Sequence, residues 1–415
     1  MVWLFGWEEL ELMGNFKKLM MASVGGSKPL VGTQEAELVG SDGRVGNFGH
    51  VVALSDDGSI AVVGANANNS PAYAGGAAYV FTRSGTTWSQ QQRLSASDAA
   101  NFDDFAYSID IDGDGDTVIA GAYQEDTNGT SAGSAYIFTR SGTTWSQQAK
   151  IQASDRAAYD WFGISSAISQ DGNTACVGAY GETSSKGAAY VFTRSGTSWS
   201  QQAKLTASDG ASNHRFGRGC DVSDDGNTIV VSAEDATSGG VTGAGAAYVF
   251  TRSGTTWSQQ AKLQAGDLVS YRTYGRNVQI SGDSNTVIVG AQNYNDNGQS
   301  SGACYIYTRS GSTWSQEQKL LASDGEASDV FGAGISLSED GNVALIGAYG
   351  DDDNGTSSGT AYIFTRSGTT WSQITKISPT GAAASDQFGR STALSGDSAT
   401  GLVGATKEKE AYIFV

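Results

Sequence analysis

Hydrophobic and polar positions along the chain follow patterns that are typical of short β-strands. Continuous apolar runs, such as residues 229–231 and 343–346, indicate strands that are buried on both faces. From Trp257 to Leu263, apolar and polar residues alternate, so that every second residue from Trp257 lies on one face and every second residue from Ser258 on the other. This alternation predicts a strand with one face in water.

These patterns recur along the chain as one repeated unit. A phrase containing Trp-Ser-Gln occurs six times, and an aromatic residue followed by Gly or Ala occurs seven times, at intervals of 54 to 58 residues. A Gly-Ala or Ser-Ala pair follows each aromatic after 16 residues. The seven aromatics are Phe48, Phe105, Phe162, Phe216, Tyr274, Phe331 and Phe388. Self-similarity at such a period indicates a repeat architecture.

Each unit contains four predicted strands. The first follows the aromatic residue and ends in a tight turn such as Asp340-Gly341, the second is the apolar run, the third reads Ala-Tyr-Val-Phe-Thr-Arg, and the fourth carries the Trp. A basic residue recurs in the fourth strand, and we interpret it as a guard against edge pairing; it is Arg93, Lys150, Lys204, Lys262, Lys319 or Lys376. An arginine that closes the third strand in six units indicates a role in building the unit.

The two ends of the repeated region complement each other. The last unit stops after its third strand, at residues 411–415, whereas residues 33–42 match the missing fourth strand. We therefore predict an all-β fold: a seven-bladed β-propeller with four-stranded antiparallel blades at residues 33–415, closed by an N-terminal strand that completes the last blade. Residues 1–32 are predicted to be a tail or docking segment, with Met1 or Met13 as the start.

Composition narrows the classes of function. The chain has 415 residues and a net charge of −18, from 25 Lys and Arg against 43 Asp and Glu. This charge argues against nucleic acid as a partner. No apolar run is long enough for a transmembrane segment, and the N-terminus is a poor secretory signal. The three Cys and two His stand in no metal or catalytic motif, so no catalytic residue is assigned.

The Phe-Gly and Gly-Ala markers resemble the FG-GAP repeat of integrin α-subunit propellers and their bacterial relatives, over residues 33–415. Gly-Ala-Tyr or Gly-Ala-Asn stands where that family often has Gly-Ala-Pro. The near-identical units also resemble repeat proteins predicted in marine bacteria and their phages. The resemblance implies an extracellular, cell-surface or virion-associated propeller that binds or assembles rather than catalyses.

The same resemblance implies a possible calcium site. The family often binds Ca²⁺ through an Asp-x-Asp-x-Asp-Gly turn between the first and second strands, and the second unit matches with Asp110, Asp112, Asp114 and Asp116. Carboxylates at alternate positions can converge on one hard cation. An Asp-rich tight turn without metal is the alternative, because the other six units have Ser at the position of Asp112.

A binding face is predicted from the loops. Connections after the second and fourth strands lie on one face of a propeller, and here they vary between units, which is typical of a binding surface but also of unconstrained drift. Candidate ligand-binding residues on this face are Tyr159, Trp161, His214, Arg215, Tyr271, Tyr349, Asp351 and Asp353. We expect a non-enzymatic module for a glycan or protein on a cell surface or in a virion. The alternative is a carboxylate-dependent glycosidase or lyase acting on polysaccharide, which would need two acids about 5–9.5 Å apart.

Overall fold

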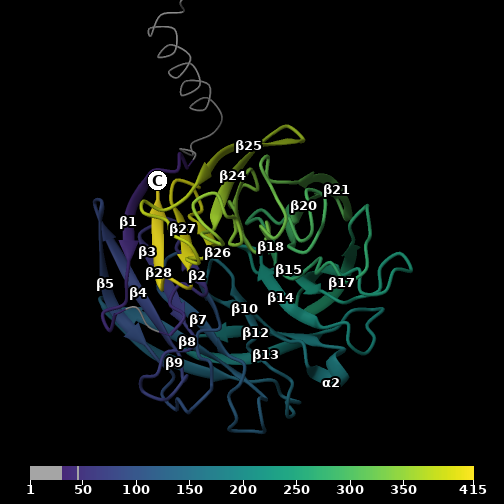
Figure 1. Ribbon diagram of the computed structural model, residues 1–415. Helices are drawn as coiled ribbons and strands as arrows, with labels where there is room; N and C mark the ends of the chain where they lie inside the picture. Colours follow the sequence, from purple (N-terminus) through teal and green to yellow (C-terminus); the bar gives the residue numbers. More distant parts are fainter. Residues whose placement is uncertain (1–29, 44–45) are drawn as a thin grey trace, which may run out of the picture.

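The computed structural model, which describes residues 30–43 and 46–415, is a ring of seven four-stranded antiparallel sheets (Figure 1). The predicted all-β, seven-bladed propeller is confirmed. One short helical turn, α2 (Glu182–Ser185), lies in the connection that follows β11.

Each blade runs from an inner strand to an outer strand. The inner strands are β2 (Val52–Leu54), β6 (Ser108–Ile111), β10 (Ser165–Ile168), β14 (Phe216–Val222), β18 (Val278–Ile280), β22 (Gly334–Leu337) and β26 (Phe388–Leu394). The second strands are β3 (Ile60–Ala65), β7 (Thr117–Ala122), β11 (Thr174–Ala179), β15 (Thr228–Ala233), β19 (Thr286–Ala291), β23 (Val343–Ala348) and β27 (Gly401–Ala405). The third strands are β4 (Ala77–Ser84), β8 (Ser134–Ser141), β12 (Ala188–Ser195), β16 (Ala246–Ser253), β20 (Ala303–Ser310), β24 (Thr360–Ser367) and β28 (Glu410–Phe414). The outer strands are β5 (Thr87–Leu94), β9 (Thr144–Ile151), β13 (Ser198–Leu205), β17 (Thr256–Leu263), β21 (Thr313–Leu320), β25 (Thr370–Ile377) and β1 (Gln34–Leu38).

The last blade combines the two ends of the repeated region. Strand β1 pairs antiparallel with β28, with Leu38 opposite Ala411, and Figure 1 shows the two strands side by side. The fold begins slightly before residue 33, because Leu30 is buried in the core of this blade and its N–H donates to the Ser398 carbonyl at 3.0 Å. Residues 1–29 of the predicted tail lie outside the described residues.

The repeated aromatic residues form the core of each blade. Phe162 is fully buried, and its ring packs against Tyr190 and Phe192 of the third strand, with centroids 5.7 and 5.9 Å apart. Equivalent trios occur in five other blades, and such tilted and edge-on pairs stabilise beyond the area they bury. In the fifth blade Tyr274 packs against Tyr305 and its hydroxyl donates to that of Tyr307. Cys176, Cys220 and Cys304 are free and buried, as their apolar surroundings in the sequence predict.

The glycine of the Gly-Ala marker permits close contact between blades. A Cβ added to Gly347 would lie closer than 3.0 Å to three backbone atoms of Gly389, on the inner strand of the next blade. The fourth blade is the exception, because Ser232 occupies this position and its Oγ accepts from the Gly219 N–H at 2.8 Å. The marker is therefore a packing requirement at the junctions between blades.

The outer strands depart from the predicted alternation. In β17, Ala261 pairs with Val249 but Gln259 pairs with Phe250, so that Gln260 is an extra residue in a β-bulge. The prediction of strict alternation was wrong because the bulge shifts the register by one residue. The same bulge occurs in each outer strand.

The bulged residue connects neighbouring blades. At six of the seven junctions its side-chain oxygen accepts from the indole N–H of the next blade, at 2.7 to 3.0 Å. The pairs are Glu35 with Trp88, Gln91 with Trp145, Gln148 with Trp199, Gln202 with Trp257, Gln260 with Trp314, and Glu317 with Trp371. At the seventh junction the next outer strand, β1, has no Trp, and the bulged residue is the apolar Ile374.

Candidate functional site

The ring has two dissimilar faces. The turn face carries the tight turns that follow the inner and third strands, and the loop face carries the longer connections that follow the second and outer strands. On the turn face the same bonds recur; for example, Ser223 Oγ donates to Asp225 at 2.8 Å, as Ser395 does to Asp397. The turn face is therefore built alike from blade to blade, and the differences are concentrated on the loop face.

A cavity of about 310 Å³ occupies the central channel and is lined mainly by the seven inner strands. Its opening on the loop face is formed by the residue that directly follows each aromatic-Gly or aromatic-Ala marker, since the inner strands start there. These residues are His50, Tyr107, Ile164, Arg218, Arg276, Ala333 and Arg390. We refer to this set as the channel mouth. Three of its seven members carry a guanidinium group.

A second set of residues, each directly after a Gly-Ala or Ser-Ala marker, contacts the channel mouth. The Arg390 guanidinium lies over the ring of Tyr349 at 4.8 Å, and that of Arg218 lies over Tyr180 at 5.8 Å. Glu234 is buried and stands 3.6 Å from Arg218 and 3.9 Å from Arg276, measured between side-chain oxygen and nitrogen. The mouth thus combines three cations with aromatic faces and one nearby carboxylate.

The pKa of His50 is sensitive to burial and to the positive charges at the mouth. Burial lowers its pKa to about 4, with further lowering by the charges of Arg390, Arg218 and Arg276. The imidazole is therefore neutral at pH 7 and packs against the ring of Tyr107, with centroids 4.9 Å apart.

Two acids lie deeper in the channel and connect inner strands. Asp110 accepts from the Ile168 N–H of the next blade at 2.8 Å, and Asp221 accepts from the Ile280 N–H at 2.8 Å. Burial raises the pKa of Asp110 to about 7, and burial together with the Asp110 charge raises the pKa of Asp221. Both acids are thus bound to backbone rather than paired around a substrate position.

The predicted calcium ligands are divided between two environments. Asp110 faces the channel, whereas Asp112 accepts from the N–H groups of Asp116 and Thr117, each at 2.9 Å. Ser55 Oγ accepts from the equivalent N–H, that of Ile60, at 3.0 Å in the first blade, so Asp112 replaces a serine in an ordinary turn. Within residues 30–43 and 46–415, no three His, Cys, Asp or Glu side chains are grouped to hold a metal ion. The four aspartates, including Asp114, do not fit a Ca²⁺ site as arranged, and calcium binding stays a prediction.

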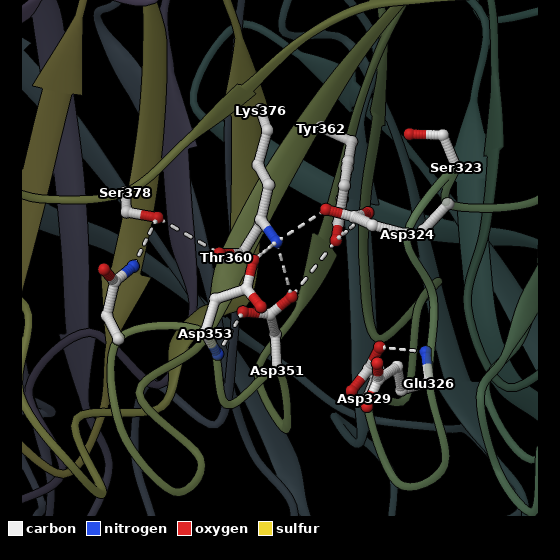
Figure 2. Close-up of polar contacts among 12 residues, drawn as sticks. Ser323, Asp324, Glu326, Asp329, Asp351, Asp353, Thr360, Tyr362, Lys376 and Ser378 are labelled. Carbon is white, nitrogen blue, oxygen red and sulfur yellow. Dashed lines mark hydrogen bonds and ion pairs between the residues drawn. The ribbon is translucent and has the colours of Figure 1, made fainter.

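Asp351 and Asp353 belong to a contact between blades (Figure 2). Lys376 Nζ lies 2.9 Å from Asp324, 2.9 Å from Asp351 and 2.6 Å from Asp353. The Tyr362 hydroxyl donates to Asp324 and Asp351 at 3.0 and 3.1 Å. Burial acts to lower the pKa of Lys376, but the three carboxylates outweigh it and raise this pKa. Both members of the acidic pair are thus already bound by a lysine of their own blade.

This Lys-Asp-Tyr contact recurs around the ring. The aspartate comes from the connection that precedes the blade, and the ammonium lies over the Tyr ring of the third strand. The other pairs are Lys150 with Asp98, Lys204 with Asp155, Lys262 with Asp209, and Lys319 with Asp267. The interpretation of these lysines as guards against edge pairing stays a prediction; in the structure each forms an ion pair with the connection from the preceding blade. The repeated arginines build the blade, as predicted; Arg252, for example, lies over Trp257 at 5.5 Å.

His214 and Arg215 also have local partners. His214 Nδ1 accepts from the Ala211 N–H at 3.2 Å, which is the part that Asp103 plays for Ala100 in another blade. Arg215 forms ion pairs with Glu234 and Asp235 at 3.2 and 3.1 Å. These contacts make His214 a turn residue and Arg215 a neighbour of the channel mouth.

The aromatic candidates differ in exposure. Tyr159 and Tyr271 are 56% and 67% exposed on loop-face connections, whereas Trp161 is partly covered and packs against Tyr180, with centroids 4.8 Å apart. Tyr349 lines the channel cavity. The structure does not bring the eight candidates together as one site, since they are distributed over several blades.

Sequence reasoning missed Arg218, Arg276 and Arg390. The signal was present, because all three directly follow the aromatic-Gly marker in their units. Aligning the units by that marker gives the ring of seven mouth residues at once.

Comparison with known families agrees with this geometry. A model of the FG-GAP repeat matches seven segments of the chain, at residues 33–81, 88–138, 145–192, 199–250, 257–307, 314–364 and 371–414. A search of curated proteins found no match. None of the described helices is long and apolar enough to cross a membrane.

Proposed function

Because the chain belongs to the FG-GAP repeat family, we propose that it is a non-enzymatic binding module that recognises a glycan or a protein through its loop face. We propose further that the protein acts outside the cell, on a cell surface or in a virion. The family match supports a binding function in general terms. The identity of the partner and its location are what we propose beyond that match.

The distribution of exposed aromatic side chains supports this proposal. Among the described residues, the Tyr and Phe side chains that are more than half exposed all lie on loop-face connections: Tyr73, Phe102, Tyr159 and Tyr271, at 56% to 67% exposure. Tyr73 and Phe102 contact each other edge to face, with centroids 5.3 Å apart. Exposed aromatics are typical anchors of recognition surfaces. The turn face, which is built alike from blade to blade, presents short polar turns.

Arrays of glycans and of surface proteins test the proposal. We expect a ligand whose binding weakens when Tyr73 or Tyr271 is changed to Ser. Ile374→Ser is the matched control, because Ile374 is also an exposed apolar residue, at 46%, but lies on an outer strand. Absence of any ligand, or equal loss in the control, would contradict the proposal. Turnover of a polysaccharide that depends on one loop-face acid would replace it with the enzymatic alternative.

A further inference from the structure

The channel mouth contains hydrogen-bond donors that have no acceptors in the described part of the chain. Arg218, Arg276 and Arg390 form no side-chain hydrogen bond there; their contacts are ion pairs at 3.6 and 3.9 Å and aromatic faces. A guanidinium offers five N–H donors in a planar arrangement that matches an oxyanion. Three such groups at one opening therefore leave many donors directed at nothing in the described chain.

Charge is also unbalanced at the mouth. Among the described residues, Glu234 is the one carboxylate within 4.0 Å of these guanidinium groups, and it also accepts a hydrogen bond from Arg215 at 3.2 Å. Arg390 has no ion pair in the described chain. The whole chain carries −18, so the mouth has the opposite sign to its molecule. At physiological ionic strength, salt screens the charges of exposed acids that lie more than about 8 Å away. The local excess of positive charge at the mouth therefore persists.

The three arginines line the same cavity. All three contribute, after burial, to the low pKa of His50, and Arg218 and Arg276 share the same carboxylate. The acids Asp110 and Asp221 lie three residues further along their strands than the corresponding mouth residues, which is about 10 Å deeper. The mouth is therefore a cationic opening, and the acids deeper in the channel make the interior less favourable for an anion.

We propose that the channel mouth binds an oxyanion, a carboxylate or a sulfate, carried by a saccharide. The cavity of about 310 Å³ lies at the lower end of the volumes of small-molecule pockets, so it suits a small ligand group. The Gln292 amide lines it and forms no hydrogen bond in the described chain, and Tyr349 also lines it, so both provide polar partners for sugar hydroxyls. This inference deepens the proposed function, and its choice of a saccharide rests on that function.

Calorimetric titration tests the inference, with a glucuronate-containing oligosaccharide and a sulfated oligosaccharide as probes and a neutral glucose oligosaccharide as the comparison. We expect the acidic probes to bind and the neutral one not to bind. Arg390→Gln should weaken binding by about tenfold or more, because a charge-assisted hydrogen bond is lost. Arg390→Lys keeps the charge and should restore part of the affinity.

Arg272→Gln is the matched control, because it removes the same charge from the loop face outside the cavity lining. Equal weakening in Arg272→Gln and Arg390→Gln would overturn the inference, since it would indicate unspecific attraction. Full affinity in Arg390→Gln would overturn it as well. An unchanged melting temperature shows that the variants are folded.

The remaining outcomes separate this inference from the proposed function. A neutral glycan or a protein that binds Arg390→Gln as well as the parent chain would leave the proposed function standing and overturn the anion site. An oligoglutamate peptide that binds as tightly as the acidic saccharides would overturn the choice of a saccharide. Acidic saccharides that bind through Arg390, while the loop-face variants Tyr73→Ser and Tyr271→Ser leave this binding unchanged, would support the anion site and not the wider loop face.

Discussion

Replacement of Gly347 by Ala tests the account of how neighbouring blades fit together. The added Cβ would lie closer than 3.0 Å to the carbonyl oxygen, the carbonyl carbon and the Cα of Gly389. No flexible side chain can yield, because all three atoms belong to the backbone of the next inner strand. The variant can fold only if the two blades move apart.

The magnitude follows from two opposing effects. Overpacking of a well-packed interior costs about 3 kcal/mol or more when backbone must shift. Replacing Gly by Ala also lowers the entropy of the unfolded chain, which offsets about 0.7 kcal/mol. The net loss in the free energy of unfolding is therefore about 2 kcal/mol or more, which corresponds to a melting temperature lower by about 2–3 °C for a domain of this size.

Gly266→Ala is the matched control. Its Cβ would have Gln316 Oε1 as the nearest atom, at 3.3 Å, and its φ is not in the left-handed region. Its N–H donates to the Gln316 side chain, as the N–H of Ser208 does to Gln259 one blade earlier, so a side chain is compatible with this position. We expect an unchanged or slightly higher melting temperature.

Thermal and guanidinium unfolding, followed by tryptophan fluorescence, measure both variants. A Gly347→Ala protein that melts with the parent chain, or no lower than Gly266→Ala, would refute the reasoning that the Gly-Ala marker is a packing requirement.

Three further predictions concern the blade contacts, the channel acids and calcium. Lys376→Met should lower the free energy of unfolding by about 3 kcal/mol, because Asp351 is only 4% exposed and loses its cation. Lys262→Met should lower it by less, because the partner carboxylate of Lys262 is 45% exposed. Equal losses of the two variants in chemical denaturation would contradict this expectation. Burial raises the pKa of Asp110 to about 7, so the folded chain keeps a proton that the unfolded chain releases at about pH 4. Stability therefore falls as pH rises through this window, and Asp110→Asn should flatten that slope in unfolding titrations; an unchanged slope would count against it. Millimolar Ca²⁺ should change neither the melting temperature of the parent chain nor that of Asp112→Ser. A large Ca²⁺-dependent shift in the parent chain that Asp112→Ser abolishes would establish the calcium site that the sequence suggests.

The fold was predictable because the repeated residues make the same contacts in most blades. The aromatic of the first marker packs in the core, the glycine of the second marker faces the next inner strand, and the Trp reaches the neighbouring bulge. The bulge itself was not predictable from alternation, since one extra residue such as Gln260 leaves the local composition unchanged while it reverses the faces.

The candidate site was predictable only in part. The face was identified from its variable loops, and Tyr159, Tyr271 and Tyr349 lie there. Asp351 and Asp353 were named as candidate ligand-binding residues, and their contact with Lys376 was not visible in the sequence, because Lys376 is 23 or more residues away and reaches them only in the folded blade. The three mouth arginines are single residues in separate units, so only closure of the ring brings them together.

Hydrogen exchange of the free and the ligand-bound chain tests the central claim most directly, using the first ligand that the arrays identify. The account predicts slowed exchange in loop-face connections, such as residues 66–76 and 267–275, and unchanged exchange in turn-face turns, such as residues 281–286. Protection confined to the turn face or to the outer strands would contradict the claim that the loop face is the recognition surface.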